Sequence, residues 1–350
     1  MTAMTTSRRT IVEALQYREA RQSIVSSYVL TDTSPPSRIN AVWRQKVIHW
    51  YFTVVAALRR QHAASSAASP GSSSSDVNPF DRTMVHVSAS LLDGYLASLS
   101  GERAMRYKRR AAYQLLATTC LLLGMRLARH ESIKEDLVST DGGGGLKRAK
   151  THRTNMNDAI NEASTAAATR VAIPTAATIL RISAAPMSIT ERHVLAMVNE
   201  LTGSRSFPRS GGVVTALDYV RALSSSFPSS GYTDEEEDLP VSLGPDGAEE
   251  ARRLADLALV DSTYPPLRPA VLACAVISLV LSKSSSSSDV VRRCVHRSVL
   301  GRLADDPELV RAACKAESHL RVLRSEPPSR DARRAIIAPP TSHLIPLEDD

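Results

Sequence analysis

The sequence predicts an all-α protein whose helices form two tandem five-helix bundles with long low-complexity loop insertions. Ala, Leu, Arg and Glu, which favour helices, are abundant, and no stretch alternates between apolar and polar residues as a strand would. Two segments, 115–125 and 269–281, are apolar almost throughout and are expected to form a central helix in each bundle. With 43% hydrophobic residues, a chain of 350 residues can build two cores.

The first part of the chain is expected to hold a lead-in segment and the first bundle. Residues 1–39 read as a helix over 8–28 followed by a Pro/Ser break, and the bundle spans 40–223 with insertions at 61–77 and 131–170. Its helices are expected at about 40–60, 79–96, 106–129, 174–183, 188–202 and 213–223, with a further helix near 154–168.

An acidic, Ser-rich linker at 224–247 is expected to separate this bundle from a second one at 248–324, and the tail from 325 to 350 reads as disordered. Asn78 before Pro79, and Asp306 before Pro307, are typical of a helix cap followed by a first turn. The helices expected in the second bundle cover about 248–260, 267–282, 289–303 and 307–323.

No recognisable catalytic constellation appears along the chain, so we expect no enzymatic activity, no cofactor and no metal. The Gly-rich stretch 141–147 lacks the Lys-Ser/Thr ending and the preceding strand of a phosphate-binding loop. Cys294 and His296 have no second ligand pair at zinc-site spacing. The carboxylates at 234–238 read as a solvated acidic linker rather than an acid/base pair.

The net charge of +7 allows anionic partners, but nucleic acid is an unlikely one. The basic stretches 106–110 and 146–153 are not interleaved with aromatic residues that could stack on bases. The second stretch fits a nuclear-import signal as well as it fits a solvated loop, so we expect the protein in the nucleus and the cytoplasm. The apolar runs are too short to span a bilayer, and we expect no membrane association.

Four sequence motifs occur along the chain in a characteristic order. Arg44 precedes Trp50 by six residues in an apolar helix, and Asp93 lies in the phrase LLDGYLAS. The stretch 113–128, YQLLATTCLLLGMRLA, is similar to the third helix of a cyclin box, and 178–201 to the fourth and fifth. Residues 251–281 resemble the start of a second, C-terminal box. The order of these motifs resembles the cyclin family, and the resemblance implies that the two bundles are cyclin boxes.

The resemblance also assigns roles to individual residues. It implies an ion pair between Arg44 and Asp93 that ties the first helix to the second. It further implies a shallow groove that docks Arg-x-Leu segments of substrates or inhibitors. The groove residues would be Trp43, Val47, Trp50 and Gln114. For Trp50, ordinary packing against a neighbouring helix is an equally good interpretation.

In cyclins, a Lys and a Glu press on the kinase. The corresponding residues here are Arg126, which keeps the positive charge, and Val198, which does not keep the negative one. The resemblance therefore implies a non-catalytic regulatory subunit that binds and activates a cyclin-dependent serine/threonine kinase in the cell cycle and cell division. Two alternatives remain open: a cyclin-fold interaction protein without kinase activation, and a DNA binder of the transcription-factor type.

Overall fold

The computed structural model describes residues 2–20, 41–67, 80–99, 101–140, 174–182, 189–204, 207, 213–224, 243–261, 267–282 and 288–325. These residues are mostly helical and include no strand, which confirms the predicted all-α class. The helices are α1 (Thr2–Ala20), α2 (Ala41–Ala67), α3 (Arg82–Ala97), α4 (Gly101–Arg106), α5 (Arg110–Thr140), α7 (Ala176–Ile182), α8 (Glu191–Gly203), α9 (Ala216–Ser224), α10 (Pro245–Val260), α11 (Pro269–Leu281), α12 (Ser288–Leu300), the 3-10 helix η1 (Gly301–Asp305) and α13 (Pro307–Ser325).

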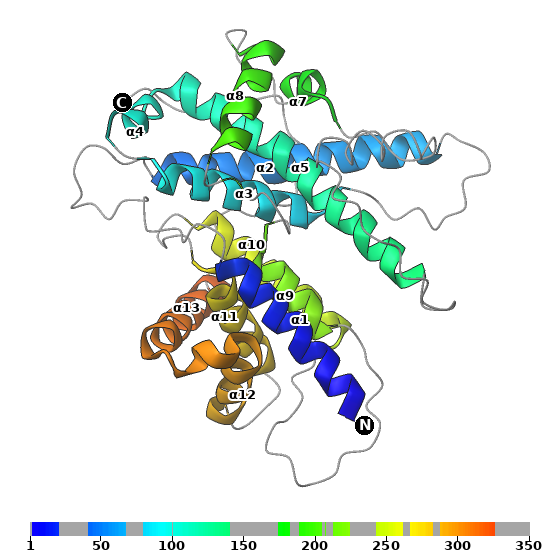
Figure 1. Ribbon diagram of the computed structural model, residues 1–350, viewed down its shortest axis with the longest axis vertical. Helices are drawn as coiled ribbons and strands as arrows, with labels where there is room; N and C mark the ends of the chain where they lie inside the picture. The colour runs from blue at the N-terminus through cyan, green and yellow to red at the C-terminus, as the bar shows by residue number, and fades with distance from the viewer. Residues whose placement is uncertain are drawn as a thin grey trace.

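The described helices pack around two separate apolar cores (Figure 1). The first core is built by α2, α3, α5, α7 and α8, with the short α4 at its edge. The second is built by α1 and α9 to α13. Helix α10 belongs to the second group but also contacts α2 and α3, so it joins the two groups.

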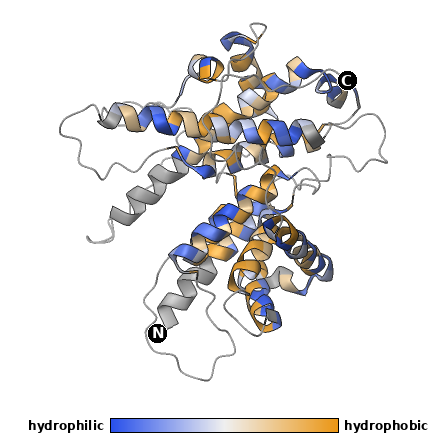
Figure 2. Ribbon diagram, turned by 180° about the vertical axis from the view of Figure 1, so that it is seen from behind, coloured by the Kyte–Doolittle hydropathy of each residue, from blue (hydrophilic) through white to orange (hydrophobic). Residues whose placement is uncertain are grey.

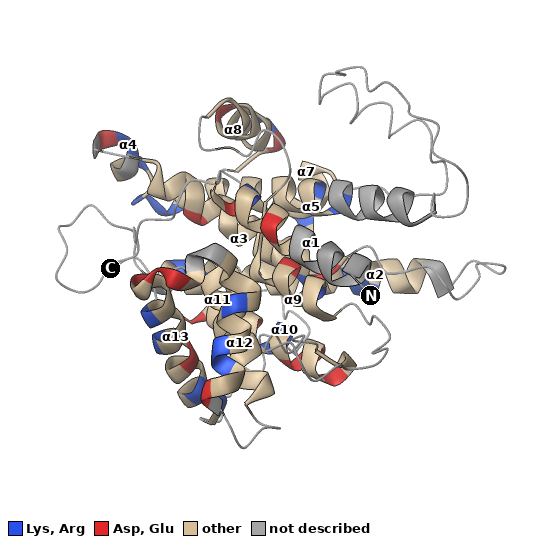
Figure 3. Ribbon diagram, turned by 60° about the horizontal axis from the view of Figure 1, so that its bottom comes forward, with Lys and Arg blue, Asp and Glu red and all other residues tan. Residues whose placement is uncertain are grey.

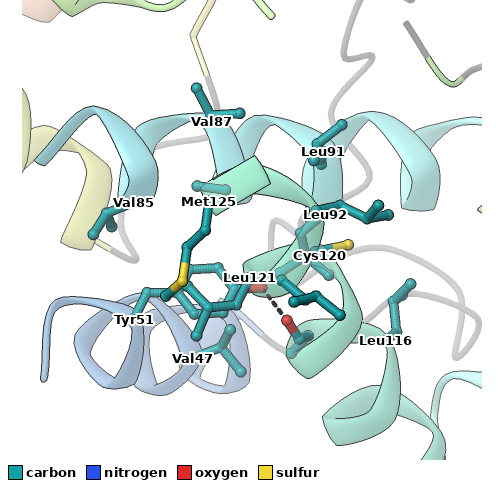
Figure 4. Close-up of a cluster of buried hydrophobic side chains, with 14 of the residues drawn as sticks. Val47, Tyr51, Val85, Val87, Leu91, Leu92, Leu116, Cys120, Leu121 and Met125 are labelled. Carbon is teal, nitrogen blue, oxygen red and sulfur yellow. Dashed lines mark hydrogen bonds between the residues drawn. The ribbon is translucent and has the colours of Figure 1, made fainter. Parts of the chain in front are cut away.

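Helix α5 is the centre of the first core, with α3, α7 and α8 packed around it. Its buried face, which includes Leu121 and Met125, meets Val47 and Tyr51 of α2 (Figure 4). The Tyr51 hydroxyl donates to the backbone oxygen of Ala117 at 2.8 Å. Residues 110–129 are long and apolar enough to span a membrane by length and composition, but 67% of the most apolar window is buried inside the structure. Core packing accounts for this apolar character.

The two long helices α3 and α5 approach each other closely at Gly124. A Cβ atom at this position would lie 2.1 Å from the Ser88 side-chain oxygen and 2.8 Å from the Ser88 Cα and backbone nitrogen. Only glycine fits this contact without displacing the backbone of α3. Gly94 differs, because nothing lies within 4 Å of the Cβ that it would carry.

Helix α11 is the centre of the second core and is buried without interruption from Ala270 to Leu279. Helices α9, α10, α12 and α13 surround it. Figure 2 shows the matching pattern, with hydrophobic colour where these helices face one another and hydrophilic colour on the outer side of α13.

The predicted boundary between the bundles was wrong for α9, which was assigned to the first bundle within 40–223. Its buried residues, among them Leu217 and Tyr219, belong to the second core. The lead-in helix α1 joins the same core through Val12 and Leu15. The Glu19 carboxylate accepts hydrogen bonds from the Tyr219 hydroxyl at 2.8 Å and from a backbone N–H in the first turn of α11 at 3.1 Å.

Several predicted helix ends also differ from those observed. Helices α2 and α5 continue to Ala67 and Thr140, into the predicted insertions at 61–77 and 131–170, because these stretches still consist largely of residues that tolerate a helix. Helix α3 is capped by Asp81, whose side chain accepts from the Thr83 N–H, so the helix begins later than predicted. The cap at Asp306 is confirmed by its bond from the Glu308 N–H at 2.9 Å.

Other predictions lie outside the described residues. These are the Asn78–Pro79 pair itself, the helix near 154–168, the Gly-rich stretch 141–147, most of the 224–247 linker and the tail after Ser325.

Candidate functional site

Arg44 and Asp93, which the sequence analysis pairs, form a bidentate ion pair between α2 and α3. Arg44 Nε lies 3.0 Å from Asp93 Oδ1, and Arg44 Nη2 lies 2.8 Å from Asp93 Oδ2. Both side chains are only 4% exposed. Two parallel charge-assisted bonds of this length fix the relative position of the two helices.

Arg44 also makes a contact that the sequence does not indicate. Its Nη1 donates to the backbone oxygen of Leu259 at 2.9 Å, in the last turn of α10. The carbonyl groups of a last helical turn lack intrahelical partners, and a cation there is favourable. The end of α10 that carries Leu259 packs against the first core, whereas the earlier turns of α10 pack in the second, so Arg44 fastens the first core to the helix that joins the two.

A second buried aspartate holds the same junction from the opposite side. His86 Nε2 of α3 lies 3.0 Å from Asp256 Oδ1 of α10, with the two side chains 3% and 5% exposed. Arg82 Nε approaches the other oxygen of Asp256 at 3.4 Å, and Arg82 Nη1 contacts Glu249 at 2.8 Å. Two buried carboxylates, Asp93 and Asp256, thus organise the contact between the cores.

The two aspartates occupy equivalent positions in their helices. Helices α3 and α10 both have sixteen residues, and Asp93 and Asp256 are the twelfth residue of each. A buried leucine stands two residues earlier in both helices, Leu91 and Leu254. This local correspondence is the kind that a duplicated helical unit would leave.

The Arg44–Asp93 pair is packed against aromatic side chains. The Trp43 and Tyr113 rings lie 5.7 Å apart between centroids, which buries one side of Trp43 against α5. Burial raises the pKa of Tyr113, and the nearby Asp93 carboxylate raises it further. The Tyr113 hydroxyl finds no hydrogen-bond partner among the described residues. The Arg44–Asp93 pair therefore sits in a largely apolar environment that screens it poorly.

Two of the four residues predicted to line a docking groove are buried. Val47 is fully buried in the first core, so the prediction that it lines a groove was wrong. It lies one helical turn before Tyr51 and faces α5 with it (Figure 4). Gln114 is 5% exposed, so its side chain is also closed to a docked peptide, contrary to the prediction. Trp43 and Trp50 are half-buried and remain partly accessible.

The two predicted kinase-contact residues are half-buried, on α5 and α8. Arg126 forms no hydrogen bond or ion pair with any residue that the structure describes. Val198 packs against the first core. No described carboxylate of α8 lies within ion-pair distance of Arg126. The nearest one in sequence to Val198, Glu200, instead contacts Tyr95 of α3 and Tyr107 in the turn before α5.

A polar cluster that the sequence analysis did not predict holds Glu200. The Tyr95 hydroxyl donates to Glu200 Oε1 at 2.9 Å, and the Tyr107 hydroxyl lies 3.3 Å from that of Tyr95 and 3.5 Å from Glu200. Burial, with the bonds to Tyr107 and Glu200, raises the pKa of Tyr95. About a hundred residues separate Tyr95 from Glu200 in the sequence, so no local pattern signals their contact.

No group of three His, Cys, Asp or Glu side chains lies close enough to hold a metal ion in the part of the chain that the structure describes. The comparisons with known proteins add no relationship. No protein-family model matches the chain, and a search of curated proteins found no match.

Proposed function

We propose that the protein is a non-catalytic regulatory subunit that resembles a cyclin and binds and activates a cyclin-dependent serine/threonine kinase. The proposal includes two tandem cyclin boxes, a nuclear and cytoplasmic location, and docking of Arg-x-Leu segments at Trp43 and Trp50 of α2, without Val47 and Gln114. It rests on the motif order in the sequence and on the buried pair that the resemblance implies.

The grouping of the helices supports two boxes of five. When α1 and the short α4 are set aside, the first core has α2, α3, α5, α7 and α8, and the second has α9 to α13. The third helix of each group, α5 or α11, is the apolar one that the others surround. The proposal therefore takes the boundary between the boxes before α9, at about 204–215, rather than after it.

The Arg44–Asp93 pair is the observation that carries the proposal. A generic helical bundle seldom buries a charged pair, because desolvating two ions costs several kcal/mol that only good geometry offsets. Here the pair has bidentate geometry and joins the two helices that the resemblance names.

The test is capture of a kinase by the purified full-length chain from a lysate of its own cells. Bound kinases are identified by mass spectrometry, and histone-type phosphorylation is assayed in the eluate. We expect a cyclin-dependent kinase in near-stoichiometric amount. Arg126→Glu should abolish capture because it reverses the charge at the predicted kinase face. Arg181→Glu, an exposed charge reversal on α7, is the matched control and should leave capture unchanged.

Val198→Glu separates activation from binding. It restores the acidic residue that the resemblance expects at this position, and it should raise phosphorylation by the captured kinase. Capture without phosphorylation in both the native chain and this variant would favour the alternative of an interaction protein that does not activate a kinase. The half-buried apolar Val198 is the observation that keeps this alternative in view. A folded chain that captures no kinase would contradict the proposal.

A further inference from the structure

A compact group of cations lies at the turn between α4 and α5. Five of the eight residues from 103 to 110 are basic, and none is buried. These residues, called here the α4–α5 cationic cluster, are Arg103, Arg106, Lys108, Arg109 and Arg110. Helix α4 stands at the edge of the first group of helices (Figure 3), and the side chains of Arg103, Arg106 and Arg109 are exposed.

The cluster is poorly neutralised by its own surroundings. Arg106 reaches Glu200 of α8 at 3.5 Å, and Glu102 is the one carboxylate on α4. Arg103, Lys108 and Arg109 form no ion pair with any described residue. The first turn of α5 also lacks an acidic residue. Like charges at this spacing repel, so the arrangement lowers the stability of the free protein.

Several arginines on α12 and α13 are paired with carboxylates. On α12 and α13, Arg292 and Arg321 share the buried Glu317, and Arg324 contacts Glu250 of α10 at 3.1 Å. Arg311 pairs with its neighbour Glu308. Within the α4–α5 cationic cluster, Arg103, Lys108 and Arg109 therefore differ from these arginines, because they lie close together without a carboxylate partner among the described residues.

An exposed apolar side chain lies within the cluster. Met105 is 48% exposed, between Arg103 and Arg106 on α4. A flexible, unbranched thioether surrounded by cations suits contact with an apolar side chain whose neighbours are acidic. Phosphate backbones offer no equivalent apolar partner.

We propose that the α4–α5 cationic cluster is a docking surface for a short acidic peptide segment of a partner protein, with Met105 contacting an apolar residue of that segment. The turn is compact, so it matches about five or six extended residues, or roughly 20 Å of chain. Nucleic acid would need a longer basic track and stacking aromatic side chains, which this turn does not offer. The proposal does not depend on the proposed kinase regulation.

The test uses fluorescence anisotropy with the full-length protein and a labelled peptide of about twelve residues, rich in Glu and Asp with one central Leu. The triple variant Arg103→Glu/Lys108→Glu/Arg109→Glu should weaken binding by at least about 30-fold. The control, Arg60→Glu/Arg181→Glu/Arg293→Glu, makes the same change in net charge at exposed positions spread over α2, α7 and α12, and should change binding less than about threefold. Circular dichroism checks that both variants remain folded.

A second variant tests the apolar contact. Met105→Ser should weaken binding of the Leu-containing peptide several-fold, by loss of buried apolar area, and leave an all-acidic peptide unaffected. Raising the salt concentration from about 50 to 300 mM should weaken both peptides at least about tenfold. Equal loss of binding in the clustered and dispersed triple variants would overturn the proposal. So would tighter binding of a single-stranded oligonucleotide of the same length, or no peptide binding at low salt.

Discussion

Breaking the Arg44–Asp93 pair from one side should be far more damaging than removing an exposed arginine from the same helix. Arg44→Met deletes three charge-assisted bonds, with donor–acceptor distances of 3.0, 2.8 and 2.9 Å, and leaves a carboxylate that is 4% exposed. An uncompensated buried charge costs about 3–5 kcal/mol. Because domains are stable by about 5–15 kcal/mol, this variant should be close to unfolding. Arg60→Met on the same helix should change stability by less than about 0.5 kcal/mol.

The assay is urea denaturation followed by far-UV circular dichroism, arranged as a double-mutant cycle. Asp93→Asn alone should also destabilise, because Arg44 then keeps a buried charge without its counter-ion. The combination of Arg44→Met with Asp93→Asn should cost less than the sum of the singles by at least about 1 kcal/mol, since the second change removes the orphaned charge. Additive effects within about 0.5 kcal/mol, or an Arg44→Met cost below about 1 kcal/mol, would refute the reasoning.

Three further predictions use matched positions. Gly124→Ala should destabilise the protein by several kcal/mol in urea denaturation, whereas Gly94→Ala should stabilise it by up to about 1 kcal/mol. Equal effects of the two substitutions would contradict the close approach of α3 and α5. Tyr51→Phe loses a buried hydrogen bond and should lower stability by about 1 kcal/mol. Tyr113→Phe removes a hydroxyl that has no hydrogen-bond partner among the described residues, and should be neutral or stabilising. A lower melting temperature for Tyr113→Phe than for Tyr51→Phe would count against these assignments. Burial lowers the pKa of His49, so the unfolded state binds a proton at a higher pH than the folded state does. The free energy of unfolding should therefore fall as the pH drops below about 6.5. His49→Leu should reduce that loss, and an unchanged dependence of stability on pH in this variant would exclude the effect.

The positions of the helices follow closely from local signals. Apolar residues at helical spacing locate α2, α5, α11 and α13, and the Asp306 cap fixes where α13 begins. Helix ends are harder because several residues can compete for a cap. Asp81 caps the start of α3, and an Ala- and Ser-rich stretch extends α2 although the same composition is also typical of a loop.

The candidate site shows where local reasoning stops. The Arg44–Asp93 pair was expected from the resemblance, which names both residues, and not from residue types and spacing alone. They do not reveal the bond from Arg44 to Leu259, which lies 215 residues away. Val47 was misplaced because helical periodicity identifies a shared face without saying which neighbour covers it. The amphipathic α9 was assigned to the wrong core for the same reason.

Kinase activation in a purified system tests the central claim most directly. Increasing amounts of the chain are added to a fixed amount of the cyclin-dependent kinase identified by capture, and phosphorylation of a histone-type substrate is measured. We expect the kinase activity to rise and to saturate at one chain per kinase. With Arg126→Glu the kinase activity should not saturate over the same range of concentrations, whereas Arg181→Glu should behave as the native chain does. A kinase whose activity is unchanged by excess folded chain would contradict the account.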